Sequence, residues 1–127
     1  MDAHGAVLNP LSKRIIGCGL RVAGTLGYGF LEKVYENALA HELRKSALSV
    51  EQQRGIAVMY DGVVVGEYFV DLVVEASILV ELKTVADLSS AHRAQCLNYL
   101  RATGMHLCLL MNFGRPRLEV RRVVFDL

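Results

Sequence analysis

The sequence predicts an α/β fold in which a mixed β-sheet is flanked by helices. Two segments with helical periodicity open the chain, three β-branched runs follow, and a further helical segment separates two more apolar runs. Runs joined by short turns pair antiparallel, whereas a helical crossover joins parallel strands, so the sheet should be mixed. With 53% hydrophobic residues, we expect residues 1–127 to form one domain with its own core.

The first two helices are predicted from apolar residues at helical spacing. Residues 1–9 are expected to be a frayed tail, and Pro10 suits the first turn of a helix that runs to about Thr25. The glycine-rich segment 24–29 should form a helix–helix turn, because it lacks the Gly-x-Gly-x-x-Gly spacing and the preceding strand of a dinucleotide loop. A second helix is expected from about Phe30 to Ser46. Its predicted buried stripe is Leu31, Val34, Ala38, Leu39 and Leu43.

Three polar residues of this second helix fall on one side. Glu32, Tyr35 and Glu36 lie at i, i+3 and i+4, so they project together near the glycine-rich turn. For Glu32 alone, the default role is to stabilise the helix start, where a carboxylate complements the helix dipole.

Three strands are expected after the second helix. The first runs from Val50 to Tyr60, and Asp61-Gly62 is a strong two-residue hairpin signal before the second strand begins at Val63. The third strand is Ile78 to Thr84. If residues 75–77 form the break between the second and third strands, Val74 pairs with Ile78.

The rest of the chain predicts a helix and two strands. The helix spans roughly Ser89 to Ala102, with Ser89 or Ser90 as its N-cap, and Gly104 ends it. The uninterrupted apolar run 107–111 has the character of a central strand, and 118–125 alternates as a closing strand. On the helix, three polar residues fall on one face, namely His92, Gln95 and Tyr99.

A trio of charged residues interrupts the second and third strands. Side chains alternate along a strand, so Glu81 and Lys83 share a face, and the register above places Asp71 opposite Glu81 on that face. A partly exposed salt bridge from Lys83 to either acid would explain the trio. A divalent metal would explain it equally well, since a hard cation relieves the repulsion between two carboxylates. Lys83 could then orient or deprotonate a water, which suggests phosphodiester chemistry.

Several classes of protein are excluded or disfavoured. No apolar run approaches the roughly eighteen residues that span a bilayer, and residues 1–10 do not have the pattern of a signal peptide, so we expect a cytoplasmic protein. The three cysteines are far apart and are expected to be buried, reduced thiols. The histidines lack metal-ligand spacing. With a net charge of +1, binding to nucleic acid would require the basic residues at the two chain ends to gather on one surface.

The sequence Gly29-Phe-Leu-Glu32-Lys-Val-Tyr35 resembles the signature of the GxxExxY family, which belongs to the PD-(D/E)xK nuclease-like superfamily together with RecB-type and restriction endonuclease domains. The resemblance extends over about residues 11–125. It includes Gly66-Glu-Tyr-x-x-Asp71, Val80-Glu-Leu-Lys83, His92-x-x-Gln95, Asn98-Tyr99 and Met111-Asn-Phe-Gly114.

The resemblance implies a restriction-endonuclease-like α-β-β-β-α-β core, here with an extra N-terminal helix and C-terminal strand. It implies that Asp71 and Glu81 bind the metal, that Lys83 is the catalytic lysine, and that Glu32 is a further or water-mediated ligand. It also implies that the helix that carries Gln95 lines the site, so Gln95 counts among the catalytic residues. Further candidates for lining the site or contacting substrate are Tyr35, His92 and Tyr99; for Tyr35, packing beside Glu32 is an equal alternative.

Two departures from the family pattern matter. Ala76 stands in the hairpin break where relatives often have glycine, and alanine resists a positive φ there, which would affect the register. The four cysteines of cluster-bearing relatives are missing, so no iron–sulfur cluster is expected.

The function expected from these features is a Mg2+- or Mn2+-dependent nuclease that acts on DNA, with RNA as the second choice. The alternative is a non-catalytic module that keeps the nuclease fold and binds nucleic acid or a protein partner, and a homodimer is compatible with either. A third option is a small binding protein in which the trio is a structural salt bridge.

Overall fold

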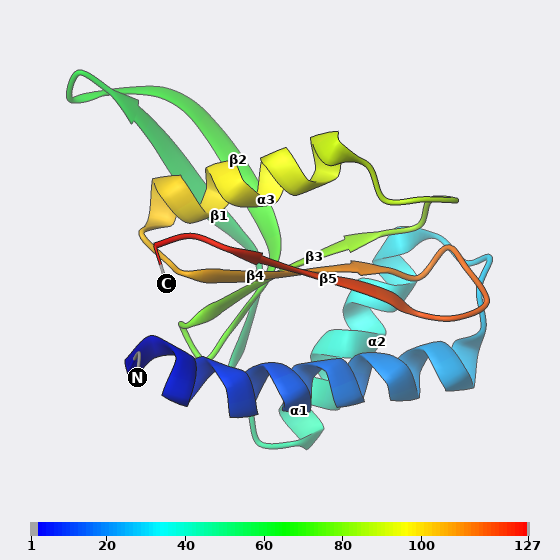
Figure 1. Ribbon diagram of the computed structural model, residues 1–127. Helices are drawn as coiled ribbons and strands as arrows, with labels where there is room; N and C mark the ends of the chain where they lie inside the picture. The colour runs from blue at the N-terminus through cyan, green and yellow to red at the C-terminus, as the bar shows by residue number, and fades with distance from the viewer. Residues whose placement is uncertain (1–2, 127) are drawn as a thin grey trace.

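The protein is a five-stranded sheet with helices on both faces (Figure 1). This computed structural model describes residues 3–126, with side chains from Leu8 onward. The strands β1 (Val50–Tyr60), β2 (Val63–Val74), β3 (Ile78–Lys83), β4 (Leu107–Asn112) and β5 (Glu119–Val124) lie in sequence order. The pair β3–β4 is parallel and the other pairs are antiparallel, so the predicted mixed sheet is confirmed.

The helices divide the core into two layers. Helices α1 (Ala3–Leu26) and α2 (Glu32–Lys45) cover one face, and α3 (Ser90–Thr103), which connects β3 to β4, covers the other. Along β3, residues 78, 80 and 82 face α1 and α2, while Leu79 faces α3. Glu81 and Lys83 alternate with Leu82, so they belong to the α3 side.

Helix α1 begins earlier than the sequence predicted. Residues 3–9 are helical rather than frayed, Pro10 lies inside the helix, and residues 1 and 2 are outside the described part. Leu8 is buried and extends the apolar stripe by one turn. Arg122 of β5 binds Ser12 and Asn9 at 2.8 and 3.0 Å, which fixes this turn although Pro10 removes one helical hydrogen bond.

The buried face of α2 also differs from the prediction. The helix begins at Glu32, so Leu31 lies outside it and is 81% exposed, and Val34 is exposed too. The residues that α2 buries are Tyr35, Glu36, Leu39, Ala40 and Leu43. The buried stripe is therefore centred on Tyr35, Leu39 and Leu43, which pack in the core, and not on Leu31 and Val34.

The break between β2 and β3 keeps the predicted register despite Ala76. Val74 pairs with Ile78, while Glu75 and Ala76 both adopt a positive φ, of 53° and 50°. The Glu75 carboxylate accepts hydrogen bonds from the backbone and the hydroxyl of Ser49 at 2.8 and 2.6 Å. This anchoring offsets the strain of the left-handed conformation.

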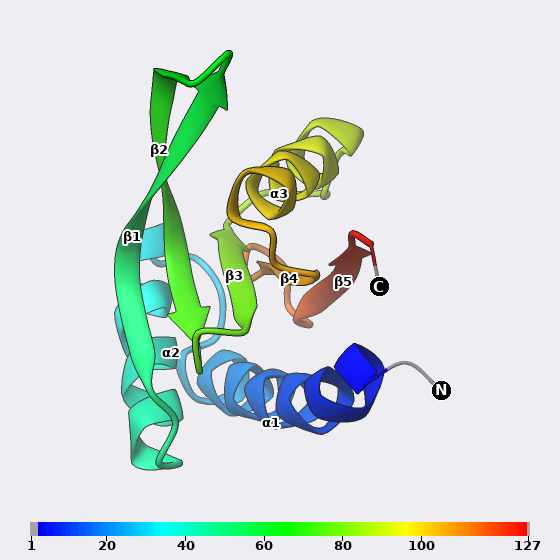
Figure 2. The same ribbon diagram turned by 90° about the vertical axis from the view of Figure 1, so that its left-hand side faces the viewer.

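The β1–β2 hairpin extends past the rest of the sheet as a two-stranded arm (Figure 2). Its turn, Asp61-Gly62, has a positive φ at both residues, as the sequence predicted. The pairing of β2 with β3 covers only residues 72–74, so the arm leaves the sheet just beyond Asp71. Among residues 3–126, no helix is both long and apolar enough to cross a membrane.

Candidate active site

The site lies where β2 parts from β3. The backbone pairing of β2 with β3 ends at Leu72 and Val80, and beyond it side-chain carboxylates accept the backbone hydrogen bonds. The Leu82 N–H donates to Asp71 Oδ2 at 2.8 Å, and the Asp71 N–H donates to Glu81 Oε1 at 3.0 Å. Both carboxylates therefore lie in the fork between the strands, where the sequence register predicted that they would meet. Both residues are buried, with exposures of 8% and 4%.

Burial leaves the negative charge of this pair poorly compensated. Desolvation, followed by repulsion from Asp71, raises the pKa of Glu81 to about 8. Desolvation also raises the pKa of Asp71, although hydrogen bonds from Leu82 and Gln53 oppose the shift. A salt bridge that neutralised the acids would lower these values instead. Two carboxylates held close together in a dry site are suited to a cation.

Lys83 stands beside the acids but is bound by an amide. Its Nζ donates to Gln95 Oε1 of α3 at 3.0 Å, while the distance from Nζ to Glu81 Oε2 is 4.0 Å. This geometry is weak for a structural ion pair, which prefers direct contact near 2.8 Å. Gln95 therefore holds the Lys83 ammonium near Glu81 at a distance where it only weakly compensates the negative charge of the carboxylate.

The end of β3 is clamped to β4. The Phe113 N–H donates to the Lys83 carbonyl at 2.8 Å, and the fully buried Asn112 side chain bonds both the N–H and the carbonyl of Val85. At Gly114, a Cβ would lie 2.5 to 2.6 Å from backbone atoms of Thr84 and Val85. The segment Asn112-Phe-Gly114 thus fixes the chain that follows Lys83.

Glu32 reaches the site from the first turn of α2. It is half-buried, and its pKa is raised by desolvation first and by Asp71 second. Gly29, at a φ of 113°, turns the chain into α2. Tyr35 holds this turn, because its hydroxyl donates to the Gly27 carbonyl at 2.8 Å and accepts from the Phe30 N–H at 3.2 Å.

Tyr35 has no exposed surface. Its ring stacks on Phe113 at a centroid distance of 4.9 Å, inside the core. Its contacts in the structure are thus those of a packing residue that positions the start of α2, and through it Glu32.

Two polar residues that the sequence analysis did not assign to the site complete it. Gln53 of β1 donates through Nε2 to Asp71 Oδ1 at 3.1 Å and to Glu36 Oε1 at 2.7 Å. Glu36 is 2% exposed and also accepts from Lys33 and Gln52. The spacing of Glu36 from Glu32 is visible in the sequence, whereas nothing in the sequence signals Gln53, whose φ of 53° is unusual in a strand.

The remaining candidates lie on α3. Tyr99 is 5% exposed, and desolvation together with the nearby Glu81 raises its pKa to about 12. His92 is part of the capping box of the helix: its Nδ1 accepts from the Ser89 N–H at 3.1 Å, while the Ser89 hydroxyl accepts from the His92 N–H. Ser89 is thus the N-cap, and Gly104 ends the helix with a φ of 75°.

The donor set suits a hard cation that keeps part of its water shell. Among the side chains of residues 8–126, no group of three or more His, Cys, Asp and Glu residues forms a ready-made metal site. Mg2+, however, is typically bound by one or two carboxylates, with waters and phosphate as its other ligands. Each oxygen of Asp71 accepts one hydrogen bond, so each keeps a free lone pair. The three cysteines are free and buried, as expected.

Three of the basic residues near the chain ends are paired with acids. Arg115 and Arg121 both lie within 3.8 Å of the Glu119 carboxylate, and Arg21 pairs with Glu42. Their charges are therefore partly used within the protein.

A model of a known protein family matches the chain. The family model described as the PD-(D/E)XK nuclease superfamily matches residues 9–123, which is most of the chain. The chain belongs to this superfamily. No curated protein and no solved structure matches the chain.

Proposed function

From its membership of the PD-(D/E)XK nuclease superfamily, we propose that this protein is a metal-dependent nuclease that hydrolyses phosphodiester bonds, with DNA favoured over RNA as substrate. The observation that carries the proposal is the pair Asp71 and Glu81, buried in the strand fork with Lys83 beside it. Membership alone would not suffice, because one fold hosts many functions.

The acids supply the metal ligands in this proposal. Asp71 and Glu81 would bind Mg2+ or Mn2+, and Glu32 would contribute directly or through a water. When bound, the cation polarises the scissile phosphate. The carboxylates also benefit, because a cation compensates the ionised forms that desolvation, and to a smaller extent repulsion from neighbouring carboxylates, disfavours in all three acids.

Lys83 and Gln95 act on the substrate side. The Lys83 ammonium donates to the attacking water or to a phosphate oxygen on which negative charge develops. The hydrogen bond to Gln95 fixes Nζ in advance, so the amine does not have to be ordered when substrate arrives.

A second candidate function is favoured by the hairpin arm. Seven of its large apolar or aromatic side chains are at least half exposed, namely Met59, Tyr60, Val63, Val64, Val65, Tyr68 and Phe69. Exposed apolar surface of this kind is typical of a protein interface. This exposed surface favours one of two functions. The protein is either a non-catalytic module that binds a partner through the arm, or a nuclease that forms a homodimer in which two arms pair.

We also propose that the chain belongs to the GxxExxY branch of the superfamily. Each residue of that spacing has a physical task in this chain: Gly29 turns the backbone, Glu32 lies near the acids, and Tyr35 holds the turn.

The test is cleavage of single-stranded, duplex and branched DNA and of RNA with added Mn2+, comparing the wild type, Lys83→Ala and the exposed-lysine control Lys13→Ala. We expect metal-dependent cutting that only Lys83→Ala abolishes. In parallel, Mn2+ should raise the melting temperature of the wild type but not of Asp71→Asn, which preserves the acceptor for the Leu82 N–H. No thermal shift and no cutting would reject the nuclease in favour of the binding module.

A further inference from the structure

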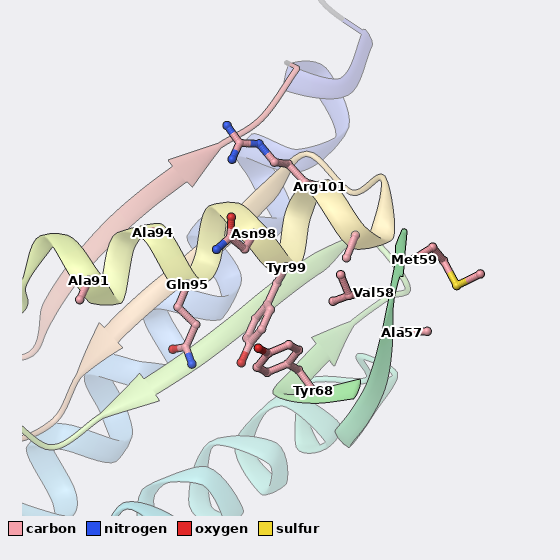
Figure 3. Close-up of a pocket in the computed structure, with 11 residues that line it drawn as sticks. Ala57, Val58, Met59, Tyr68, Ala91, Ala94, Gln95, Asn98, Tyr99 and Arg101 are labelled. Atoms are coloured by element: carbon pink, nitrogen blue, oxygen red, sulfur yellow. The ribbon is translucent and has the colours of Figure 1, made fainter. Parts of the chain in front are cut away.

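A groove runs between α3 and the hairpin arm. Its volume is about 750 Å3. The side of α3 that faces the arm carries Ala91, Ala94 and Ala102, all exposed, so short side chains leave the space open. Figure 3 shows that Gln95, Tyr99 and Tyr68 lie on one side of the helix, with the two tyrosine rings close together, while Asn98 and Arg101 lie on the other side.

The groove is continuous with the candidate active site. Gln95 lines the groove and accepts the hydrogen bond from Lys83. Tyr99 also lines the groove and is close enough to Glu81 for an electrostatic interaction between the two side chains. A ligand in the groove would therefore lie directly beside a phosphate bound at the acids.

The wall of the groove has the chemistry that recognises a nucleobase. The Tyr68 side chain is accessible, with 52% of the residue exposed, and its ring lies 5.8 Å from that of Tyr99. An exposed aromatic ring offers a stacking platform for a base, and the amide of Gln95, which lies on the same side of the helix, can bond its edge. Of the described residues, those lining the groove include one cation, Arg101, and no carboxylate, so the groove wall itself adds no negative charge to that of the acids.

A base inside a duplex cannot reach these rings, because it is covered by its neighbours in the stack. It must be unpaired, or must leave the stack at an energetic cost. Resting on the nuclease activity proposed above, we infer that this groove holds an unpaired nucleotide next to the scissile phosphate, its base stacked on Tyr68. The preferred substrate is then single-stranded or frayed DNA rather than an intact duplex.

Binding tests this inference without requiring cleavage. The probe is a fluorescently labelled DNA oligonucleotide, single-stranded or annealed to its complement, titrated with protein in the presence of Ca2+ as a metal that permits binding. We expect tighter binding of the single strand. Tyr68→Ala should weaken that binding about tenfold, the effect typical of losing one stacked base, whereas Tyr68→Phe should retain it.

Two further variants separate groove binding from general damage. Ala94→Leu fills the groove from the exposed helix side and should weaken single-strand binding to a similar extent. Tyr60→Ala removes an exposed tyrosine of the same arm that does not line the groove, and should leave binding unchanged. Circular dichroism and melting temperature verify that each variant folds.

Several results would overturn the inference. Equal affinity of the Tyr68→Ala variant and the wild type for single strands, or a wild-type preference for duplex, would do so while metal-dependent cleavage still stood. Failure of the wild type to bind either oligonucleotide would also overturn the inference. So would a loss of self-association in Ala94→Leu with unchanged DNA binding, because the groove would then be a contact between copies of the chain. Cleavage and thermal-shift data on Lys83→Ala and Asp71→Asn report separately on the nuclease proposal.

Discussion

Replacing Glu81 with glutamine should change how the stability of the metal-free protein depends on pH. The folded protein holds the Glu81 proton up to about pH 8, whereas the unfolded chain releases it near the ordinary pKa of 4.5. Between these values the folded state binds more protons, so a rise in pH favours unfolding. The contribution of Glu81 is therefore complete below about pH 4.5 and is lost as the pH rises to 8.

The magnitude follows from the size of the pKa shift. Each pKa unit corresponds to about 1.4 kcal/mol, so the full cost of ionising Glu81 in the folded state is roughly 5 kcal/mol. Side-chain relaxation and water entry reduce such costs in real proteins, and we expect a loss of about 2–4 kcal/mol. Glu81→Gln cannot ionise, yet its amide oxygen can still accept from the Asp71 N–H. Its stability should therefore fall much less with rising pH.

The assay is urea unfolding followed by circular dichroism at pH 5, 7 and 9 in the presence of EDTA, for the wild type, Glu81→Gln and the exposed control Glu67→Gln. The variant should become more stable than the wild type as the pH rises, while Glu67→Gln should follow the wild type. Parallel pH profiles for the wild type and Glu81→Gln would refute the claim that the carboxylate is buried without compensation. Stability that is lost at low pH instead would indicate that Lys83 forms a structural salt bridge.

Three further substitutions test the elements that position the site. Ala76→Gly should stabilise the protein by about 0.5–1 kcal/mol in urea unfolding, because glycine relieves the positive φ but raises the entropy of the unfolded chain; a loss of stability would contradict this. Gly114→Ala should destabilise by about 3 kcal/mol or more and lower any cleavage rate, since its Cβ would collide with the backbone at Val85; a melting temperature equal to the wild type would be incompatible with that contact. Tyr35→Phe should cost about 1–2 kcal/mol through loss of the bond to the Gly27 carbonyl, and an unchanged unfolding midpoint would show that the hydroxyl does not hold the turn.

The parts of the fold that local chemistry controls were predictable. The Asp61-Gly62 turn, the Ser89 cap, the Gly104 stop and the pairing of Val74 with Ile78 each depend on a few neighbouring residues. The start of α1 was not predictable from local pattern, because Asn9 and Ser12 bind Arg122, which is distant in the sequence.

The candidate site shows the same division. Alternation along two adjacent strands was enough to bring Asp71, Glu81 and Lys83 together from the sequence. The burial of Glu36 and its hydrogen bond from Gln53 could not be predicted from the sequence. Both depend on which hydrogen-bond donors β1 places against α2. Hydrophobicity alone even predicted the opposite burial at the start of α2, where Val34 and the preceding Leu31 are exposed and Glu36 is buried.

The sequence by itself determined the order of the elements, the register of β2 with β3, and the set of acids and amine gathered there, because periodicity and turn chemistry are local properties. Only the tertiary structure decided that the strands part at Asp71, that burial raises the pKa of Glu81, and that a groove beside Gln95 remains open. Solvation and packing depend on what the rest of the chain places around a residue, and that is a property of the folded molecule as a whole.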